Sequence, residues 1–328
     1  MTDAPDRLPV PSYDRLRANT PPGSSWGIFQ LDPERGMANF AGPSQVLTGV
    51  ATVTRGVTFN LDHALDAFDP PMARARQAPR HELLSSHSES FDDVLHGFYP
   101  QASSQLDGLR HRRASGYGFY NGIPDDHIGV GLPALGVQRW AEKPIVGRGI
   151  VIDIEGLLAT EDTPLDHRGG PALDVDVLDR ALAWQGESVQ PGDLVLVHTG
   201  WTRWFLDADP NRRAEVRDAR SATGFRQDTR FPEWLWDHQI ALFATDTFAV
   251  EVLPVDPASP FRHSAPEDSG MMHQELIAKL GIPLGELWDL TALTADSHTT
   301  GQWDCLTVVK PLNMTGGVGS PANATALR

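Results

Sequence analysis

Cysteine is nearly absent from the sequence: Cys305 is the only one among 328 residues. A single cysteine excludes a disulfide framework within the chain and is typical of a reducing compartment. Positive charge is also scarce, because 27 Lys and Arg stand against 43 Asp and Glu, which gives a formal net charge of −16. Such a surface repels phosphate backbones, so we expect no nucleic-acid partner.

Long hydrophobic runs are missing as well. No stretch approaches the roughly 18 consecutive apolar residues that span a bilayer, and the segment from Met1 to Tyr13 has no apolar region typical of a secretory signal. We therefore expect a cytoplasmic protein with no membrane partner. Hydrophobic residues still make up 40% of the chain, which is enough for a large core.

The distribution of proline and small polar residues along the sequence suggests how the chain is organised. Residues 1–25 are rich in Pro, Ser and polar groups and are predicted to form an N-terminal arm. No internal repeat, low-complexity block or shift in composition divides residues 26–328, which are predicted to be a single domain. Within it, residues 50–54 and 56–61 are predicted to be strands, and residues 69–92 a long surface loop.

The second half alternates predicted strands with predicted helices, which indicates an α/β fold. The predicted strands cover residues 150–154, 194–197 and 242–245. Helices are predicted from Asp176 to before Gly186, from Pro232 through Trp236, and from Met272 to Leu280 with Gly281 as the terminating residue.

The segment Ser104–His111 concentrates side chains suited to metal binding. Gln105 and Asp107 are two residues apart and share a face if the chain is extended, and His111 follows four residues later. A carboxylate and a neutral imidazole are common zinc or manganese ligands, whereas an amide oxygen is a weaker and harder donor. The spacing taken alone favours a purely structural role, in a polar turn before Gly108.

A second group contains His273 and Glu286. Glu286 lies in the apolar run 282–290, and a buried carboxylate without a partner is costly, so a metal or a basic residue is expected beside it. A strand whose Glu286 faces water explains the pattern equally well. His198, directly after the predicted strand 194–197, is interpreted as a strand-end histidine.

Taken together, these segments resemble the cyclase family of metal-dependent hydrolases, which includes kynurenine formamidase, isatin hydrolase and a trans-dienelactone hydrolase. The stretch 101–111 resembles the family motif H-x-G-T-H-x-D-x-P-x-H, and further similar blocks follow in order from about Trp26 to Asn323: Tyr120–Gly122, Trp140–Gly149, Gly192–Trp201, Asp246–Glu251 and His273–Ile277. The resemblance implies a swivelling β/β/α fold with a mixed sheet, a homodimer or homotetramer, and a divalent metal, Mn²⁺ or Zn²⁺.

Position by position, the resemblance assigns metal binding to Asp107, His273 and Glu286. It assigns to His111 the role of general base or of ligand to a second metal ion.

The chain departs from the motif at three positions. Gln101 and Gln105 stand where the motif has its two leading histidines, and Leu109 stands where it has proline. We include Gln105 among the predicted metal ligands, as an oxygen donor, and leave Gln101 out. The loss of two imidazoles favours manganese over zinc.

The predicted function is hydrolysis of a small amide, lactone or cyclic imide by metal-activated water, with His111, at an ordinary pKa near 6.5, as the general base. The side chains predicted to contact substrate are Trp26, Phe98, Tyr120, Asp246 and Glu251. For Asp246 and Glu251, helix capping and a surface position are competing explanations.

Two alternative functions remain open. The first is a metal-assisted cyclase, dehydratase or isomerase acting on a carbonyl substrate. The second is a non-catalytic protein that binds a small molecule and whose metal site has decayed.

Overall fold

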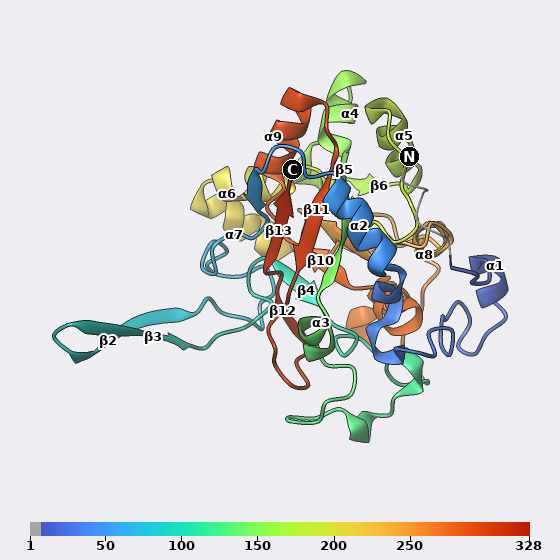
Figure 1. Cartoon of the computed structure of the whole chain (residues 1–328), viewed down its shortest axis with the longest axis horizontal. Helices are drawn as coiled ribbons and strands as arrows, with labels where there is room; N and C mark the ends of the chain where they lie inside the picture. The colour runs from blue at the N-terminus through green and yellow to red at the C-terminus, as the bar shows by residue number, and fades with distance from the viewer. Residues whose placement is uncertain (1–7) are drawn as a thin grey trace.

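A nine-stranded mixed sheet forms the centre of the protein in the computed structural model, which describes residues 8–328 (Figure 1). From one edge to the other the strand order is β1-β13-β11-β5-β7-β9-β10-β4-β12. The strands are β1 Thr58–Asn60, β4 Gln105–Asp107, β5 Ile145–Asp153, β7 Leu194–His198, β9 Leu242–Thr245, β10 Leu284–Glu286, β11 Asp304–Val309, β12 Gly319–Pro321 and β13 Ala324–Leu327. The predicted α/β class with a mixed sheet is confirmed.

The four central strands β5, β7, β9 and β10 run parallel to one another. Strands β7 and β9 are buried at every position, as parallel strands are when helices cover both faces of a sheet. Parallel strands bring their carboxyl ends to the same edge, so Asp153, His198 and Glu286, the last residues of β5, β7 and β10, all lie toward that edge. α/β proteins commonly bind ligands at this edge of the sheet.

Strand β4 lies between β10 and β12 and is antiparallel to both. Its register with β10 places Gln105 opposite Glu286 and Asp107 opposite Leu284. Because side chains alternate along a strand, Gln105 and Asp107 project from the same face of β4, as the spacing predicted.

Helices pack on both faces of the sheet. Figure 1 shows α2 across β5 and β11, and α4, α5 and α9 gathered at the end where β5 finishes. The α-helices are α1 Tyr13–Leu16, α2 Pro43–Ala51, α3 Gln138–Glu142, α4 Ile154–Thr160, α5 Asp176–Gln185, α6 Trp201–Asp207, α7 Pro210–Ala219, α8 Arg230–Asp237 and α9 Thr291–Thr300. The 3₁₀ helices are η1 Pro33–Phe40, η2 Tyr120–Gly122, η3 Asp125–His127, η4 His167–Gly169 and η5 Pro266–Asp268, and η6 Gln274–Leu280 is a π-helix.

The predicted elements of the second half agree closely with the structure. Strands β5, β7 and β9 cover the three predicted runs. Helix α5 begins at Asp176 and ends before Gly186, whose left-handed conformation (φ +73°) terminates it. The helix predicted over 272–280 is present as the π-helix η6, and Gly281 (φ +76°) ends it as expected.

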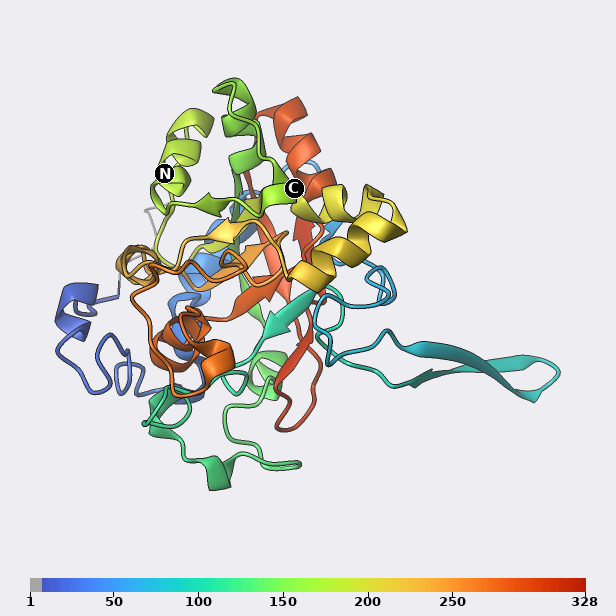
Figure 2. The same cartoon turned by 180° about the vertical axis from the view of Figure 1, so that it is seen from behind.

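Two local predictions in the first half are wrong. Most of residues 50–54 lie at the end of α2 and in the turn after it, because Pro43 at the first turn starts a helix that outlasts the β-branched run. Residues 69–92 are only partly a loop, since β2 Arg80–His87 and β3 Ser90–His96 pair as a hairpin. Figures 1 and 2 show this hairpin projecting away from the body. It packs little against the body, so its sequence lacks the apolar alternation by which strands are recognised.

The N-terminal segment packs against the body from residue 8 onward, while residues 1–7 of the predicted arm lie outside the described part of the chain. Tyr13 and Leu16 belong to the main hydrophobic core, and the Tyr13 amide donates a 2.8 Å hydrogen bond to Asp237 Oδ1.

A second small sheet pairs β6 Ala172–Leu173 with β8 Gly224–Phe225. Among residues 8–328, no helix is long and apolar enough to cross a membrane.

Candidate metal centre

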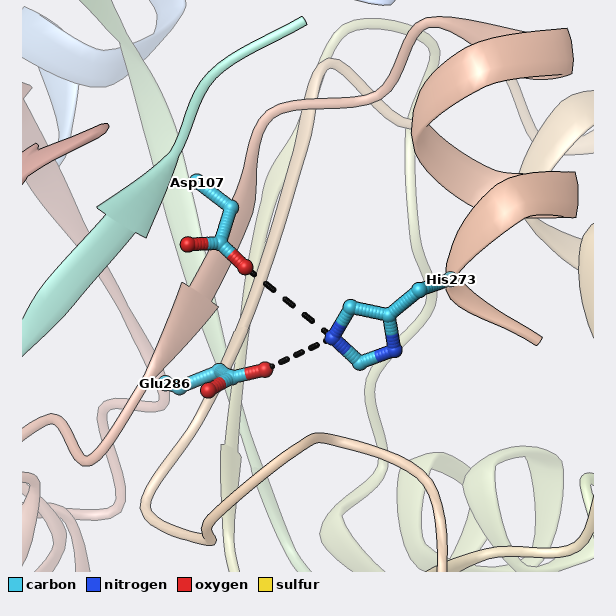
Figure 3. A group of neighbouring side chains, drawn as sticks. All are labelled: Asp107, His273 and Glu286. Atoms are coloured by element: carbon cyan, nitrogen blue, oxygen red, sulfur yellow. Dashed lines mark hydrogen bonds and ion pairs between the residues drawn. The ribbon is translucent and has the colours of Figure 1, made fainter. Parts of the chain in front are cut away.

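Three buried side chains from distant parts of the chain, Asp107, His273 and Glu286, converge on one point (Figure 3). His273 Nε2 lies 2.9 Å from Glu286 Oε1 and 3.9 Å from Asp107 Oδ2. None of the three side chains is more than 3% exposed. One imidazole nitrogen and two carboxylate oxygens at such separations are a donor set that holds manganese or zinc.

The backbone explains how these side chains meet. Asp107 ends β4 and Glu286 ends β10, and the two strands are hydrogen-bonded neighbours. His273 directly precedes the π-helix η6, and its side chain points toward the two carboxylates (Figure 3). The prediction that Glu286 needs a partner is met by His273 and by Gln105, whose Nε2 donates a 2.5 Å hydrogen bond to Glu286 Oε2.

Glu251 holds His273 from behind. Its Oε1 accepts a 2.5 Å hydrogen bond from His273 Nδ1 and a 3.1 Å bond from the His273 amide. Its Oε2 accepts from the Met272 amide at 2.7 Å and from Gln227 Nε2 at 2.8 Å. With Nδ1 donating to Glu251, His273 Nε2 is the nitrogen that faces Asp107 and Glu286.

Opposing effects set the pKa values of the two central groups. Burial alone would lower the pKa of His273, but hydrogen bonds to Glu251 and Glu286 outweigh it and raise the pKa to about 10. Burial would raise the pKa of Asp107, but the neighbouring His111, His273 and Arg76 favour the carboxylate and the net shift is downward. The lowered pKa keeps Asp107 ionised, and a divalent cation competes with a proton for the imidazole nitrogen of His273.

One atom of the group has no hydrogen bond. Asp107 Oδ2 is buried and without a hydrogen-bond partner among the described residues, and its nearest ring nitrogens are 3.5 Å away on His111 and 3.9 Å away on His273. Buried polar atoms are nearly always satisfied. An unsatisfied carboxylate oxygen facing an imidazole and a second carboxylate fits a bound cation.

The two glutamines that replace motif histidines interact with the carboxylates. Gln101 Nε2 donates to Asp107 Oδ1, and Gln105 Nε2 donates to Glu286. Gln105 Oε1, the atom expected to ligate the metal, accepts a 2.8 Å hydrogen bond from Arg76 Nη1. Sequence reasoning missed Arg76 because it lies in the segment interpreted as a surface loop, and it left Gln101 out of the site.

His111 lies at the edge of the group, with Nε2 3.5 Å from Asp107 Oδ2 and the side chain 15% exposed. Burial lowers its pKa to about 4, which corrects the ordinary value near 6.5 that the sequence led us to assume. His111 also lines a cavity of about 410 Å³ together with Arg112, Phe119, His263 and Gln274.

Of the five side chains predicted to contact substrate, only Glu251 lies in the cluster, and it orients His273. None of the five lines the cavity beside His111. Tyr120 is fully buried with its hydroxyl 3.1 Å from Ser25 Oγ, and Trp26 Nε1 donates to the Ala278 carbonyl and lines a separate cavity.

The other two also lie away from this cavity. Phe98 is half-buried just after β3. Asp246 accepts hydrogen bonds from the amides of Thr199 and Gly200. Each is accounted for by its contacts or position in the fold, and a role in substrate binding remains a prediction.

Comparison with known proteins identifies a family model and solved structures that resemble this chain. The sequence model of the family described as "Putative cyclase" matches residues 57–252. A crystal structure described as a novel cyclase is 28% identical, covers 93% of this chain and 99% of its own, and superposes with a TM-score of 0.79. The predicted cyclase fold is thereby confirmed. No curated protein sequence gives a significant match.

Two isatin hydrolases share the fold at greater distance. One, bound to the product analogue thioisatinate, is 16% identical with a TM-score of 0.52. The other, isatin hydrolase A from Ralstonia solanacearum, is 15% identical with a TM-score of 0.52. In both comparisons 83% of this chain and 92% of the other are covered.

Proposed function

The chain belongs to the cyclase family, and on that premise we propose that it is a metal-dependent hydrolase of a small amide, lactone or cyclic imide. The observation that carries the proposal is the buried convergence of Asp107, His273 and Glu286 next to a cavity lined by His111. The cavity of about 410 Å³ suits a small molecule.

The metal proposed for this group is manganese or zinc, held by Asp107, His273 and Glu286. Such an ion supplies Lewis acidity, which makes water nucleophilic at neutral pH and polarises a carbonyl group. Gln105 orients Glu286 through its amide while Arg76 holds the amide oxygen. In this arrangement Gln105 acts by positioning a ligand, which refines its predicted role as an oxygen donor.

His111 is the proposed general base. Since burial lowers its pKa to about 4, the imidazole is neutral at pH 7 and has a lone pair available to accept a proton from water. Its position at the border between the buried acids and the cavity places it between the ligand group and a bound substrate.

The predicted homodimer or homotetramer is retained as part of the proposal. A two-stranded ribbon is only marginally stable alone in water, and the β2–β3 hairpin exposes Leu83 (61%) and Phe91 (68%). Burial of Leu83 and Phe91 against a second copy of the chain would stabilise the hairpin and would explain why these apolar side chains are exposed in a single chain. Residues 26–328 acting as one catalytic domain, and a cytoplasmic location, stay predictions.

The decisive experiment is elemental analysis of the purified protein, followed by a screen of lactones, cyclic imides, N-formyl amides and isatin. We expect bound transition metal and a product heavier than the substrate by one water. A product of unchanged mass, or of mass reduced by one water, would instead identify an isomerase, or a cyclase or dehydratase. Protein that is active and free of metal would overturn the proposal.

One observation favours the non-catalytic alternative as a second candidate. The Gln101 and Gln105 amides already donate to Asp107 and Glu286, so both carboxylates have protein partners. If that network replaces the ion, the folded protein contains no metal after dialysis against manganese or zinc and still binds members of the same compound set. Calorimetric titration of the metal-free protein distinguishes the two functions.

A further inference from the structure

The cavity beside His111 has a basic lining in a protein that is acidic overall. The whole sequence has 27 Lys and Arg against 43 Asp and Glu. Three arginines line the cavity, Arg110, Arg112 and Arg113, and of the described residues around it Asp268 is the one acid. A concave surface with charge of one sign focuses the field and attracts a ligand of the opposite sign. A neutral substrate would leave this lining unexplained.

Two of the three arginines are accounted for by other contacts. Arg110 is used by the fold, because its guanidinium donates to three backbone carbonyls. Arg113 is half-exposed, and its Nη1 lies 3.0 Å from Asp125 Oδ2. Arg112, which follows His111 directly, is the arginine that remains for a ligand.

Arg112 is only loosely paired within the protein. Its Nη1 lies 3.3 and 3.4 Å from the two carboxylate oxygens of Asp268, and its Nε is buried without a partner among the described residues. Bonds between charged nitrogen and oxygen groups are ordinarily about 2.7–2.9 Å long. Arg148, by contrast, binds Asp193 through Nε at 3.0 Å and Nη2 at 2.6 Å. The fork of Arg112 is therefore available to a second carboxylate, whose geometry it matches.

Gln274 supplies a second unsatisfied atom in the lining of the same cavity. It follows His273 directly, is 3% exposed, and its Oε1 is buried with no hydrogen-bond partner in the described part of the chain. Buried polar atoms are nearly always paired, and an acceptor oxygen pairs only with a donor. Among the compounds of the proposed function, secondary amides and imides have an N–H that can serve as this donor, whereas lactones have none.

We infer that the substrate is a carboxylate-bearing secondary amide or imide, with its carboxylate bound by Arg112 and its N–H by Gln274 Oε1. The inference rests on the proposed hydrolase function for the reaction, but the two contacts bind such a molecule whether or not it is cleaved. Each contact also adjoins a residue of the proposed site in the chain, His111 before Arg112 and His273 before Gln274. The binding groups are thus anchored to the groups that act on the bond.

Calorimetric titration with two matched compounds tests the carboxylate contact. The compounds are N-formylphenylalanine and its neutral carboxamide, and their aromatic ring suits a cavity that Phe119 also lines. The titration uses Asp107→Asn and, in parallel, wild-type protein freed of metal by a chelator, so that neither hydrolysis nor a bond from metal to carboxylate contributes. We expect the anion to bind about tenfold or more tightly than the carboxamide, as hydrogen bonds to a charged group imply.

Three variants separate this contact from a general effect of charge. Arg112→Gln should bind the two compounds equally and keep the affinity of wild type for the carboxamide, which also shows that the variant is folded. Arg74→Gln makes the same change in net charge at an exposed residue that pairs with Asp218 and does not line the cavity, so it should keep the preference. Asp268→Asn removes the acid that competes for Arg112 and should strengthen binding of the anion.

An ester analogue tests the contact with Gln274. The formate ester of 3-phenyllactate keeps the carboxylate and the ring of N-formylphenylalanine but has an oxygen in place of the N–H. It should bind about tenfold more weakly, because it leaves the buried Gln274 Oε1 unpaired. Gln274→Met, which keeps the length of the side chain without an acceptor oxygen, should bind the amide and the ester equally.

The outcomes distinguish this inference from the proposed function. If the anion does not bind, binds no better than the carboxamide, or keeps its advantage in Arg112→Gln, the carboxylate contact is overturned while the hydrolase proposal stands. If the ester binds as tightly as the amide, the contact with Gln274 is overturned. A preference for the anion in wild-type protein that holds no metal and cleaves nothing would instead support the binding contacts and overturn only the proposed reaction.

Discussion

Glu251 Oε1 and His273 Nδ1 are 2.5 Å apart, and neither side chain is more than 3% exposed. This contact decides which nitrogen of the imidazole faces Asp107 and Glu286. The same carboxylate also accepts hydrogen bonds from the backbone amides of Met272 and His273 and from the side chain of Gln227. These bonds hold Glu251 in the position from which it orients the ring.

Glu251→Gln should therefore weaken metal binding without removing a ligand. A neutral amide is a poorer acceptor for the Nδ1 proton, and loss of such an outer carboxylate typically costs roughly 10–100-fold in affinity. Manganese titration measures the effect, with Glu275→Gln as control, because Glu275 pairs with Lys279 on η6. Equal affinity in wild type and Glu251→Gln would show that this carboxylate does not tune the site.

Asp107→Asn should abolish metal binding at the Asp107–His273–Glu286 cluster. The substitution keeps the shape of the side chain but removes the charge of a fully buried carboxylate whose Oδ2 has no hydrogen-bond partner among the described residues. Metal content per chain is measured by elemental analysis. The control is Asp92→Asn, an exposed acid on the β2–β3 hairpin. Full metal content in Asp107→Asn would remove this residue from the ligand set.

His111→Ala should keep the metal but reduce turnover by about 100-fold or more, the usual effect of losing a general base. The control is His263→Ala, which lines the same cavity but binds the Met271 carbonyl and none of the ligands. Steady-state kinetics on the identified substrate measure the effect. If both variants retain wild-type turnover, His111 is not the base.

Manganese should support more activity than zinc. The converging donors are one imidazole nitrogen and two carboxylate oxygens, and oxygen-rich sites favour manganese relative to sites built from several imidazoles. Metal-free protein reconstituted with each ion in turn, at equal occupancy, gives the comparison. Higher turnover with zinc would contradict the expectation.

Alkaline pH should unfold the protein through two buried tyrosines. Burial raises the pKa of both Tyr13 and Tyr120 above the ordinary value of 10. A folded-state pKa above the unfolded one contributes stability that is present below pH 10 and is lost as the pH rises further. Phenolate absorbance followed together with circular dichroism should show these two phenols ionising only as the fold is lost. Their ionisation in the folded protein would contradict this linkage.

The sequence predicts correctly those elements whose conformation is set by residues next to one another in the chain. The run 194–197 is apolar at every position and forms β7, and Gly186 and Gly281 end the helical segments before them with a positive φ. The predicted pairing of Gln105 and Asp107 on one face likewise needed only the two-residue period of a strand.

The contacts that complete the site could not be predicted in this way. Arg76 contacts Gln105, which lies 29 positions away in the sequence, and Gln105 contacts Glu286, which lies 181 positions away. No local periodicity predicts contacts between residues so far apart in the chain. The lowered pKa of His111 depends on burial by segments remote from it in the chain. His198 was interpreted as a strand-end histidine because Asp153, which binds it, lies 45 positions earlier on another strand.

The place of β4 in the sheet bears on how the protein is made. This strand is flanked only by β10 and β12, both antiparallel to it and both close to the C-terminal end of the chain. During translation, Gln105 and Asp107 leave the ribosome long before either neighbour exists, and they pair only when residues 284–321 have been synthesised. Contacts so distant in sequence form slowly, so the cluster of Asp107, His273 and Glu286 is among the last features that a newly made chain acquires.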